Sequence, residues 1–215
     1  RPSPSAYPAG FTPEQAAAFD YAPVAYHTLK IAAGLRPGET VLLHAAAGGT
    51  GVLAVQLAKH FGARVLATAG SPEKLELVHK LGADLAINYR TDDFVREVLD
   101  ATDGRGADVV WDPVGGDVFS RSLDCMAEGG RLVSLGSNTF TGGAQVDFYP
   151  FWAHNLNLIG WGSRSNAAAH DPEIMEELLA LAEAGQLKPV VGRVLPFAEA
   201  AAAHRLIEER QAIGK

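Results

Sequence analysis

The feature that most constrains this chain is a glycine-rich turn, Ala45-Ala46-Ala47-Gly48-Gly49-Thr50-Gly51. An apolar run at residues 40–44 precedes the turn, and an apolar-periodic helix at residues 52–59 follows it. Glycines let the backbone turn sharply and approach a phosphate without a Cβ in the way. The free N–H groups at a helix start then point at the anion. The order strand, glycine turn, helix therefore predicts a dinucleotide-binding unit.

The spacing of the glycines supports the same interpretation. In the usual G-x-G-x-x-G pattern, Ala46 replaces the first glycine, whereas Gly48 and Gly51 hold the second and third places. An ordinary strand–helix turn needs only one glycine. This turn has three, because Gly49 is a glycine in addition to the two that match the pattern. We therefore interpret the turn as a pyrophosphate-binding site.

The end of the second predicted strand indicates which dinucleotide would bind. This strand, residues 64–69, ends where the adenosine ribose lies, about 20 residues after the turn. An NAD site needs Asp or Glu there, but this chain has Gly70 and Ser71. Ser71 stands at the N-cap of the next helix and Lys74 lies one turn inside it, so a hydroxyl, backbone donors and a cation can meet a 2′-phosphate. The same residues also make a plain capped helix start. The pattern predicts NADP rather than NAD.

Composition limits the remaining possibilities. The chain has 215 residues, 47% of them hydrophobic, and a net charge of −7, which indicates a soluble globular domain and argues against binding to nucleic acid or an anionic membrane. There is no apolar run of about 18 residues and no signal-like apolar segment near the start. The single cysteine, Cys125, excludes an internal disulfide, and we expect it in the core. We expect a cytoplasmic protein.

Six apolar runs of strand length alternate with helical stretches. The predicted strands are residues 40–44, 64–69, 85–88, 107–111, 131–135 and 156–160. The predicted helices are residues 13–33, 49–61, 72–81, 93–102, 117–127, 172–184 and 197–209. The pattern predicts an α/β fold, a doubly wound parallel six-stranded Rossmann sheet in the order 3-2-1-4-5-6 with helices on both faces. Residues 1–10, 138–145 and 161–171 are expected to be a tail and two loops.

Other chemistry is sparse in the sequence. Asp112 follows a buried strand, so its carboxylate either faces the ligand crevice as a catalytic group or caps the next turn, and both readings stay open. His44 ends a core strand and is interpreted as structural, and His204 as an ordinary helix residue. No His or Cys pair has metal-ligand spacing, and neither a G-x-S-x-G elbow nor a Walker P-loop occurs. We therefore expect no metal site and no ATP hydrolysis.

Several longer segments carry a resemblance to a known family. They are Leu35–Gly51, Ser71–Lys74, Leu81–Asp84, Ile87–Arg90, Gly104–Gly116 and Gly129–Val133. With them the chain, from Phe11 to Lys215, resembles the medium-chain dehydrogenase/reductase superfamily, and within it the zinc-independent quinone oxidoreductases related to zeta-crystallin.

The resemblance implies a set of cofactor contacts. It implies pyrophosphate contacts from Gly49, Thr50, Gly51 and Val52, 2′-phosphate contacts from Gly70, Ser71, Lys74 and Tyr89, and nicotinamide-side contacts from Val114, Leu135, Gly136 and Ser137. Thr50 stands where the family usually has valine. The implied activity is hydride transfer from NADPH to a quinone or an α,β-unsaturated carbonyl, without a metal. The family has no universal acid or base, so no catalytic residue is predicted.

The resemblance also implies a domain organisation. Family members begin with a GroES-like substrate domain, so residues 1–10 are expected to be the tail of such a domain and residues 11–215 the NADP-binding Rossmann domain. This piece alone is then expected to bind NADPH but to be a poor catalyst. Family members commonly pair their sixth strands across a two-fold axis, which predicts a homodimer through residues 156–160.

Two alternatives remain open. The chain could be the enoyl-reductase domain of a polyketide or fatty-acid synthase, a group that shares the Ala-Ala-x-Gly-Gly turn. That group typically has a lysine just after the fifth strand, where this chain has Gly136-Ser137-Asn138-Thr139, which favours a stand-alone enzyme. The other alternative is a nucleotide-binding module without enzymatic activity.

Overall fold

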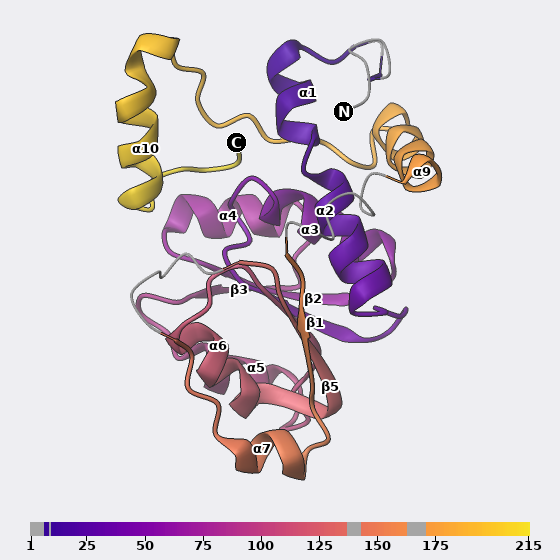
Figure 1. The fold of residues 1–215 in the computed structure, drawn as a ribbon, viewed down its shortest axis with the longest axis vertical. Coiled ribbons are helices and arrows are strands. Elements are labelled where there is room, and N and C mark those ends of the chain that lie inside the picture. Colours follow the sequence, from indigo (N-terminus) through magenta and orange to yellow (C-terminus); the bar gives the residue numbers. More distant parts are fainter. Residues whose placement is uncertain (1–6, 9, 137–142, 163–170) are drawn as a thin grey trace.

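Six parallel strands form one sheet, in the order β3-β2-β1-β4-β5-β6 (Figure 1). The computed structural model describes residues 7–8, 10–136, 143–162 and 171–215. The strands are β1 (Thr40–Leu43), β2 (Arg64–Ala69), β3 (Leu85–Asn88), β4 (Ala107–Asp112), β5 (Met126–Ser134) and β6 (Asn157–Gly160). All five neighbouring pairs are parallel. The predicted fold class and strand order are confirmed.

Helices cover both faces of the sheet because alternate strand residues point to opposite sides. Val41, Val65 and Val109 belong to a core shared with the helices on one face. Leu42 and Leu66 belong to a second core on the other face. The helices after the first strand are α3 (Gly51–His60), α4 (Pro72–Lys80), α5 (Phe94–Ala101), α6 (Asp117–Ser122), η3 (Leu123–Cys125), α7 (Phe148–Ala153), α9 (Pro172–Glu183), η5 (Phe197–Glu199) and α10 (Ala200–Glu208).

The predicted helix at residues 13–33 is wrong as a single element. The segment contains α1 (Pro13–Phe19), α2 (Ala22–Tyr26) and a π-helical stretch, η2 (His27–Ala32). Asp20 ends α1, and Pro23 stands in the first turn of α2, where its missing N–H and its ring are tolerated. Proline thus explains the break that apolar periodicity alone did not reveal.

The predicted helix at residues 117–127 is too long. It ends as α6 followed by the short η3, and the chain enters β5 at Met126, five residues before the predicted strand start. Met126 pairs with Ala107 of β4. Pairing with β4 therefore places Met126 and Ala127 in a strand, although the apolar pattern predicted a helix for them. The six-residue helix α7, which Asp147 caps by accepting from the Tyr149 N–H at 3.0 Å, was not predicted. Much of the predicted tail and loops, residues 1–6, 9, 138–142 and 163–170, lies outside the described residues.

Candidate dinucleotide-binding site

The predicted site lies at the carboxyl ends of β1 and β4, where the strand order reverses direction. Such a reversal leaves a crevice, because the connections from the two strands run to opposite faces of the sheet. The N–H of His44 donates to the carbonyl of Trp111 at 3.1 Å and continues the pairing just beyond the end of β1. The glycine turn follows at once, which places it at the switch point.

The turn is tightly built. Ala45 has a φ of 50°, and its carbonyl accepts from the Gly48 N–H at 3.0 Å. The Ala46 N–H donates to the carbonyl of Thr68 on β2 at 3.1 Å. A Cβ on Gly51 would lie 2.5 Å from the Ala45 oxygen and 2.7 Å from the Ala46 carbonyl carbon. The third glycine of the pattern is therefore required by backbone contact within the turn itself.

The turn presents backbone donors at the start of α3. The N–H groups of Thr50 and Gly51 donate no hydrogen bond within the part of the chain that the structure describes. The N–H of Val52 is different, because it donates to the Gly48 carbonyl at 3.0 Å. Free N–H groups at a helix N-terminus suit an anion such as a pyrophosphate. Thr50 and Gly51 therefore offer the donors, and Val52 contributes packing.

The C-terminal segment lies against this turn, which the sequence analysis missed. The Gly214 N–H donates to the Ala47 carbonyl at 2.8 Å, and Gly214 bridges to Gly48 in parallel. A Cβ on Gly49 would lie 3.1 Å from the Lys215 side chain. The two segments are far apart in the sequence, and no local motif signals their contact.

The residues predicted to hold a 2′-phosphate lie together beyond the ends of β2 and β3. Ser71 caps α4, where its hydroxyl accepts from the Lys74 N–H at 3.4 Å, as predicted. The phenol of Tyr89 packs directly over Gly70, because a Cβ at residue 70 would collide with it. The Lys74 ammonium donates to the Arg210 carbonyl at 2.6 Å, so the C-terminal segment reaches this part of the site too.

The electrostatics of this group centre on Lys74. Burial lowers the pKa of its ammonium, the nearby Arg90 guanidinium lowers that pKa further, and Tyr89 and Glu73 raise it. Arg90 is thus a second cation beside the predicted one, and the sequence analysis did not name it. Its position directly after Tyr89, just past the end of β3, is the signal that could have identified it. The group therefore offers two cations, Lys74 and Arg90, and the Ser71 hydroxyl, which favour an anionic ligand. Glu73, a carboxylate on the same helix turn, acts against them.

The predicted nicotinamide-side residues come from two adjacent loops. The Leu135 N–H donates to the Asp112 carbonyl at 3.0 Å, and a Cβ on Gly136 would lie 3.1 Å from the Pro113 oxygen. Val114 follows in the first of these loops. Ser137, the last predicted contact, lies outside the described residues.

Asp112 itself holds the loop. Its buried carboxylate accepts from the Val114 N–H at 2.7 Å and from the Gly115 N–H at 3.1 Å. Burial raises the pKa of this carboxyl, and the two N–H bonds lower it. Of the two readings left open by the sequence, the geometry supports the turn cap, because both donors belong to the next loop.

Three other residues were singled out by the sequence: His44, Cys125 and His204. His44 is buried and hydrogen-bonded through both ring nitrogens. Cys125 is buried, and burial raises the pKa of its thiol to about 12, so it is a core residue as expected. His204 lies exposed on α10.

The described residues contain neither a candidate metal cluster nor a candidate membrane-spanning helix. Across residues 7–8, 10–136, 143–162 and 171–215, no three His, Cys, Asp or Glu side chains gather closely enough to hold a metal ion. In the same residues no helix has the length and apolar character needed to cross a membrane.

Comparison with known proteins identifies relatives. The family of zinc-binding dehydrogenases matches residues 49–184. A 2-haloacrylate reductase from Burkholderia is 37% identical over 84% of this chain and 55% of its own length. A reducing polyketide synthase from Cochliobolus heterostrophus is 37% identical over 89% of this chain and 8% of its own length. The crystal structure of Escherichia coli quinone oxidoreductase complexed with NADPH superimposes with a TM-score of 0.86 and 33% identity, covering 97% of this chain and 65% of the other.

The chain therefore spans about half the length of the stand-alone curated relatives and under a tenth of the synthases.

Proposed function

This chain belongs to the zinc-binding dehydrogenase family and to its quinone oxidoreductase branch, and we propose that it is the NADPH-binding part of an oxidoreductase that transfers hydride to a quinone or an α,β-unsaturated carbonyl. One observation carries the proposal. The free N–H groups of Thr50 and Gly51 and the cluster around Lys74 stand at the two places where a dinucleotide phosphate and a ribose 2′-phosphate would lie.

The residues present fit this cofactor. Gly51 keeps a Cβ out of the backbone cradle, and Gly70 makes room for the phenol of Tyr89 beside Ser71 and Lys74. We propose that Ala46, Gly48, Gly49, Thr50, Gly51 and Val52 hold the pyrophosphate, that Gly70, Ser71, Lys74 and Tyr89 hold the adenosine 2′-phosphate, and that Val114, Leu135, Gly136 and Ser137 line the nicotinamide. When bound, NADPH supplies the hydride.

The chain's own contribution to the reaction is positioning. Backbone donors at the start of α3 fix the phosphates, and the loop held by Asp112 sets the wall beside Leu135 and Gly136. Holding two reactants in the reactive geometry removes much of the entropic barrier. No side chain is assigned as an acid or base, and no zinc step is proposed.

The test is the Lys74→Ala variant in an NADPH titration. Removal of a charged hydrogen-bond donor costs roughly 1.5–3 kcal/mol, so the Kd for NADPH should rise about ten- to a hundredfold, while NADH binding barely changes. Lys80→Ala is the matched control, because Lys80 lies on the same helix in an exposed ion pair with Glu76. An equal loss of NADH and NADPH affinity in Lys74→Ala would contradict the 2′-phosphate assignment.

A second candidate is the enoyl-reductase domain of a polyketide synthase. The 37% identity to a reducing polyketide synthase equals that to the 2-haloacrylate reductase, and the crystal structure of the CurK enoyl reductase superimposes with a TM-score of 0.80. Enoyl thioesters and free quinones, offered side by side to the full-length protein with NADPH, separate the two candidates. Turnover of neither acceptor would favour a non-enzymatic NADPH-binding module.

We also propose that these 215 residues bind NADPH but oxidise it slowly. Residues 1–10 would be a tail and residues 11–215 the NADP-binding domain. Val114 and Leu135 are only partly buried and Gly136 is exposed, which leaves the nicotinamide side open to water. Quinone-dependent oxidation by this chain should stay near the uncatalysed rate, and robust saturable activity would contradict the proposal. A cytoplasmic location is part of the same proposal.

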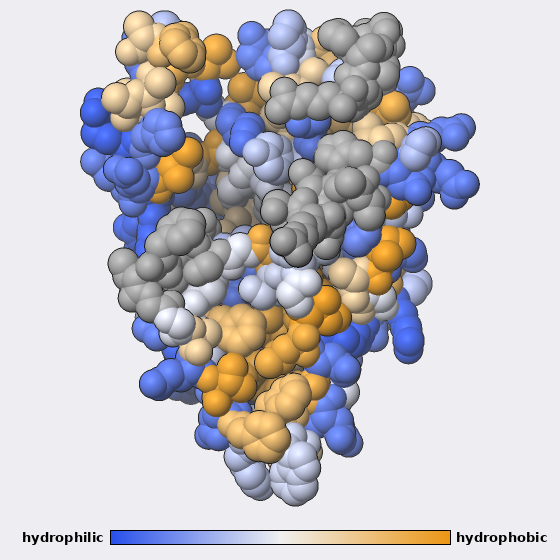
Figure 2. All heavy atoms as spheres, in the orientation of Figure 1, coloured by the Kyte–Doolittle hydropathy of each residue, from blue (hydrophilic) through white to orange (hydrophobic). Residues whose placement is uncertain are grey.

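We propose a homodimer through residues 156–160. Leu158 is 36% exposed on β6, at the end of the sheet, and the neighbouring α7 exposes Phe148, Tyr149 and Trp152 by 68%, 69% and 66%. Figure 2 shows hydrophobic residues gathered over this end of the molecule. An open strand edge beside a large apolar patch favours association with a second copy.

A further inference from the structure

His44 takes no part in the contacts proposed above, yet it is buried and has a hydrogen-bond partner at each ring nitrogen. The residue is only 2% exposed. Nδ1 lies 3.1 Å from the hydroxyl of Thr68, and Nε2 lies 3.0 Å from the hydroxyl of Ser122. The ring of Phe94 packs edge-on against the imidazole, with the two ring centroids 4.9 Å apart. A buried side chain with two fixed polar partners usually has a specific structural purpose.

The neighbouring bonds fix the tautomer of this imidazole. The Ser122 hydroxyl donates to the Val118 carbonyl at 2.6 Å, so it accepts from Nε2–H of His44. Nδ1 then accepts from the Thr68 hydroxyl. Burial lowers the pKa of His44 to about 3, so the ring is neutral at physiological pH.

The three residues belong to three different elements around the proposed site: His44 to the turn after β1, Thr68 to β2 and Ser122 to α6. His44 directly precedes Ala45, the first residue of the glycine turn and one with a φ of 50°. Thr68 lies two residues before Gly70, and its carbonyl also accepts from Ala46. Ser122 ends α6, the helix that follows the nicotinamide-side loop. One imidazole therefore joins the glycine turn, the end of β2 and the end of α6.

We propose that His44 is a positioning residue for the cofactor, which as a neutral Nε2–H imidazole holds the glycine turn, the end of β2 and the end of α6 in the arrangement that binds NADPH. The inference rests on the proposed function. Its physical basis is preorganisation, because loops that are already fixed lose less freedom when the ligand binds. Removal of either hydrogen bond lets one element move relative to the others and weakens the cofactor's contacts.

The test compares two buried threonines in the full chain. Thr68→Val removes the bond to Nδ1 and keeps the side-chain shape. Thr102→Val is the matched control, because Thr102 is also buried, donates to the Val98 carbonyl at 2.7 Å and accepts from the Gly106 N–H at 2.9 Å, far from the carboxyl edge of the sheet. Thr68→Val should raise the Kd for NADPH roughly three- to tenfold. Thr102→Val should lower Tm while leaving that Kd within about twofold.

A second variant keeps the inference falsifiable if Thr68→Val fails to fold. Ser122→Ala breaks the other bond of His44 and should also raise the Kd for NADPH. If Thr68→Val and Ser122→Ala bind NADPH as tightly as the unmutated chain while losing stability, His44 is only structural and the inference is overturned, although the proposed function stands. If the unmutated chain does not bind NADPH, the proposed function fails and the inference fails with it.

A measurement without the cofactor tests the tautomer. The imidazole ¹⁵N spectrum of the free chain should give His44 a protonated Nε2 and an unprotonated Nδ1 at pH 7. A proton on Nδ1, or a charged ring, would overturn the proposed arrangement.

Discussion

The centre of the sheet at β1 and its edge at β6 differ in how completely they are covered. All four residues of β1 are buried, and the glycine turn beyond it is closed by backbone contacts. On β6, by contrast, Asn157, Leu158 and Gly160 are exposed and only Ile159 is half-buried. The glycine turn proposed to hold the pyrophosphate is therefore closed by the chain's own backbone, whereas the β6–α7 end exposes apolar side chains in the part of the chain that the structure describes.

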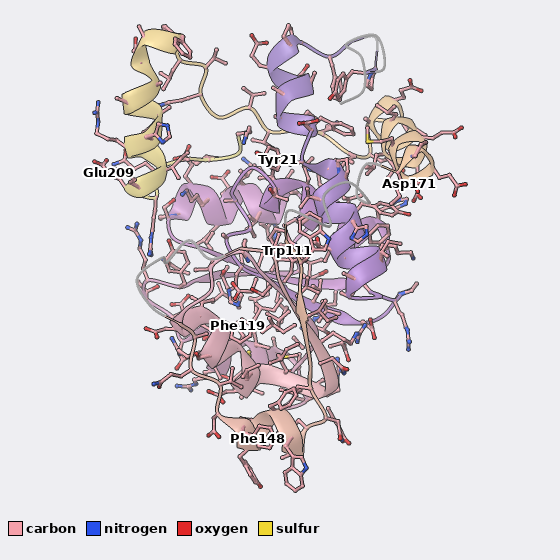
Figure 3. All side chains as sticks on the ribbon, viewed as in Figure 1. Tyr21, Trp111, Phe119, Phe148, Asp171 and Glu209 are labelled. Carbon is pink, nitrogen blue, oxygen red and sulfur yellow. The ribbon has the colours of Figure 1, made fainter. Side chains whose placement is uncertain are left out.

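Figure 3 shows the same contrast in the side chains. Trp111 of β4 lies in the crowded centre of the molecule, where its indole N–H donates to the Thr28 hydroxyl at 2.8 Å. Phe148 of α7 lies at the tip, 68% exposed. The aromatic side chain of Trp111 fills the core, whereas that of Phe148 forms part of the surface. Substitutions near the first should therefore lower stability, and substitutions near the second should change association instead.

The largest difference should appear between two glycines. Gly51→Ala drives a Cβ into the backbone of Ala45 and Ala46, whereas Gly160→Ala on β6 meets open space. Overpacking against backbone should cost about 3 kcal/mol for Gly51→Ala and lower Tm by roughly 6–12 °C. Thermal unfolding of both variants measures the contrast. Equal Tm values would mean that the turn is not closed in this way.

A charge on the open edge should break the proposed dimer. Leu158→Lys places an ammonium where two β6 strands would meet, and should weaken dimerisation about a hundredfold. Ile207→Lys is the control, because Ile207 is exposed on α10, away from that edge. Light scattering at tens of micromolar should give a dimer mass for the control and a monomer mass for Leu158→Lys. A monomer mass for the unmutated chain would contradict the dimer proposal.

A smaller effect is expected when the pH is lowered, because burial of neutral His44 makes the free energy of unfolding depend on pH. The folded state holds its pKa near 3, below the ordinary 6.5, so the unfolded chain binds more protons between these values. Stability is then full above about pH 6.5 and falls as the pH drops toward 3, by at most about 1.4 kcal/mol per pH unit. The pKa values of Asp84 and Asp108 are also lowered, but their contribution is lost only below about pH 3.8.

In urea unfolding between pH 4.5 and 7, Asp112 acts in the opposite direction, because its raised pKa stabilises the folded chain as the pH falls, so the histidine is isolated by comparing the unmutated chain with a His44 variant. His44→Gln should flatten the pH dependence, and the exposed His204→Gln should leave it unchanged. A His44→Gln chain that keeps the full slope would show that other groups cause it.

The smallest expected effect is at the cysteine. Cys125 is buried, its thiol pKa is raised to about 12, and its Sγ–H donates to the Ser122 carbonyl at 3.4 Å. A thiol reagent should label none of the native chain over minutes and one equivalent after unfolding. Rapid labelling of the native chain would show that this core opens easily.

The sequence was sufficient for the sheet. Strand patterns gave the order of all six strands, and β2 and β3 match their predicted ranges. The N-cap at Ser71 was also predictable, because capping is a local interaction. What failed depended on contacts remote in sequence: the end of α6, set by the pairing of Met126 with Ala107, and the approach of Gly214 to the glycine turn.

The candidate site divides in the same way. The family resemblance grouped Lys74 with Tyr89, and the two lie together beyond the ends of the adjacent strands β2 and β3. Nothing in the sequence indicated that the Arg210 carbonyl would accept a hydrogen bond from Lys74. It also could not choose a role for Asp112, because catalysis and capping require the same residue after the same strand.

The most direct test of the account is a paired titration of the unmutated chain with NADPH and NADH, followed by fluorescence. The account predicts saturable NADPH binding at least about tenfold tighter than NADH binding, since the two ligands differ only in the 2′-phosphate that would meet Ser71, Lys74 and Tyr89. Equal affinity for the two would contradict the assignment of that cluster, and binding of neither would contradict the cofactor site as a whole.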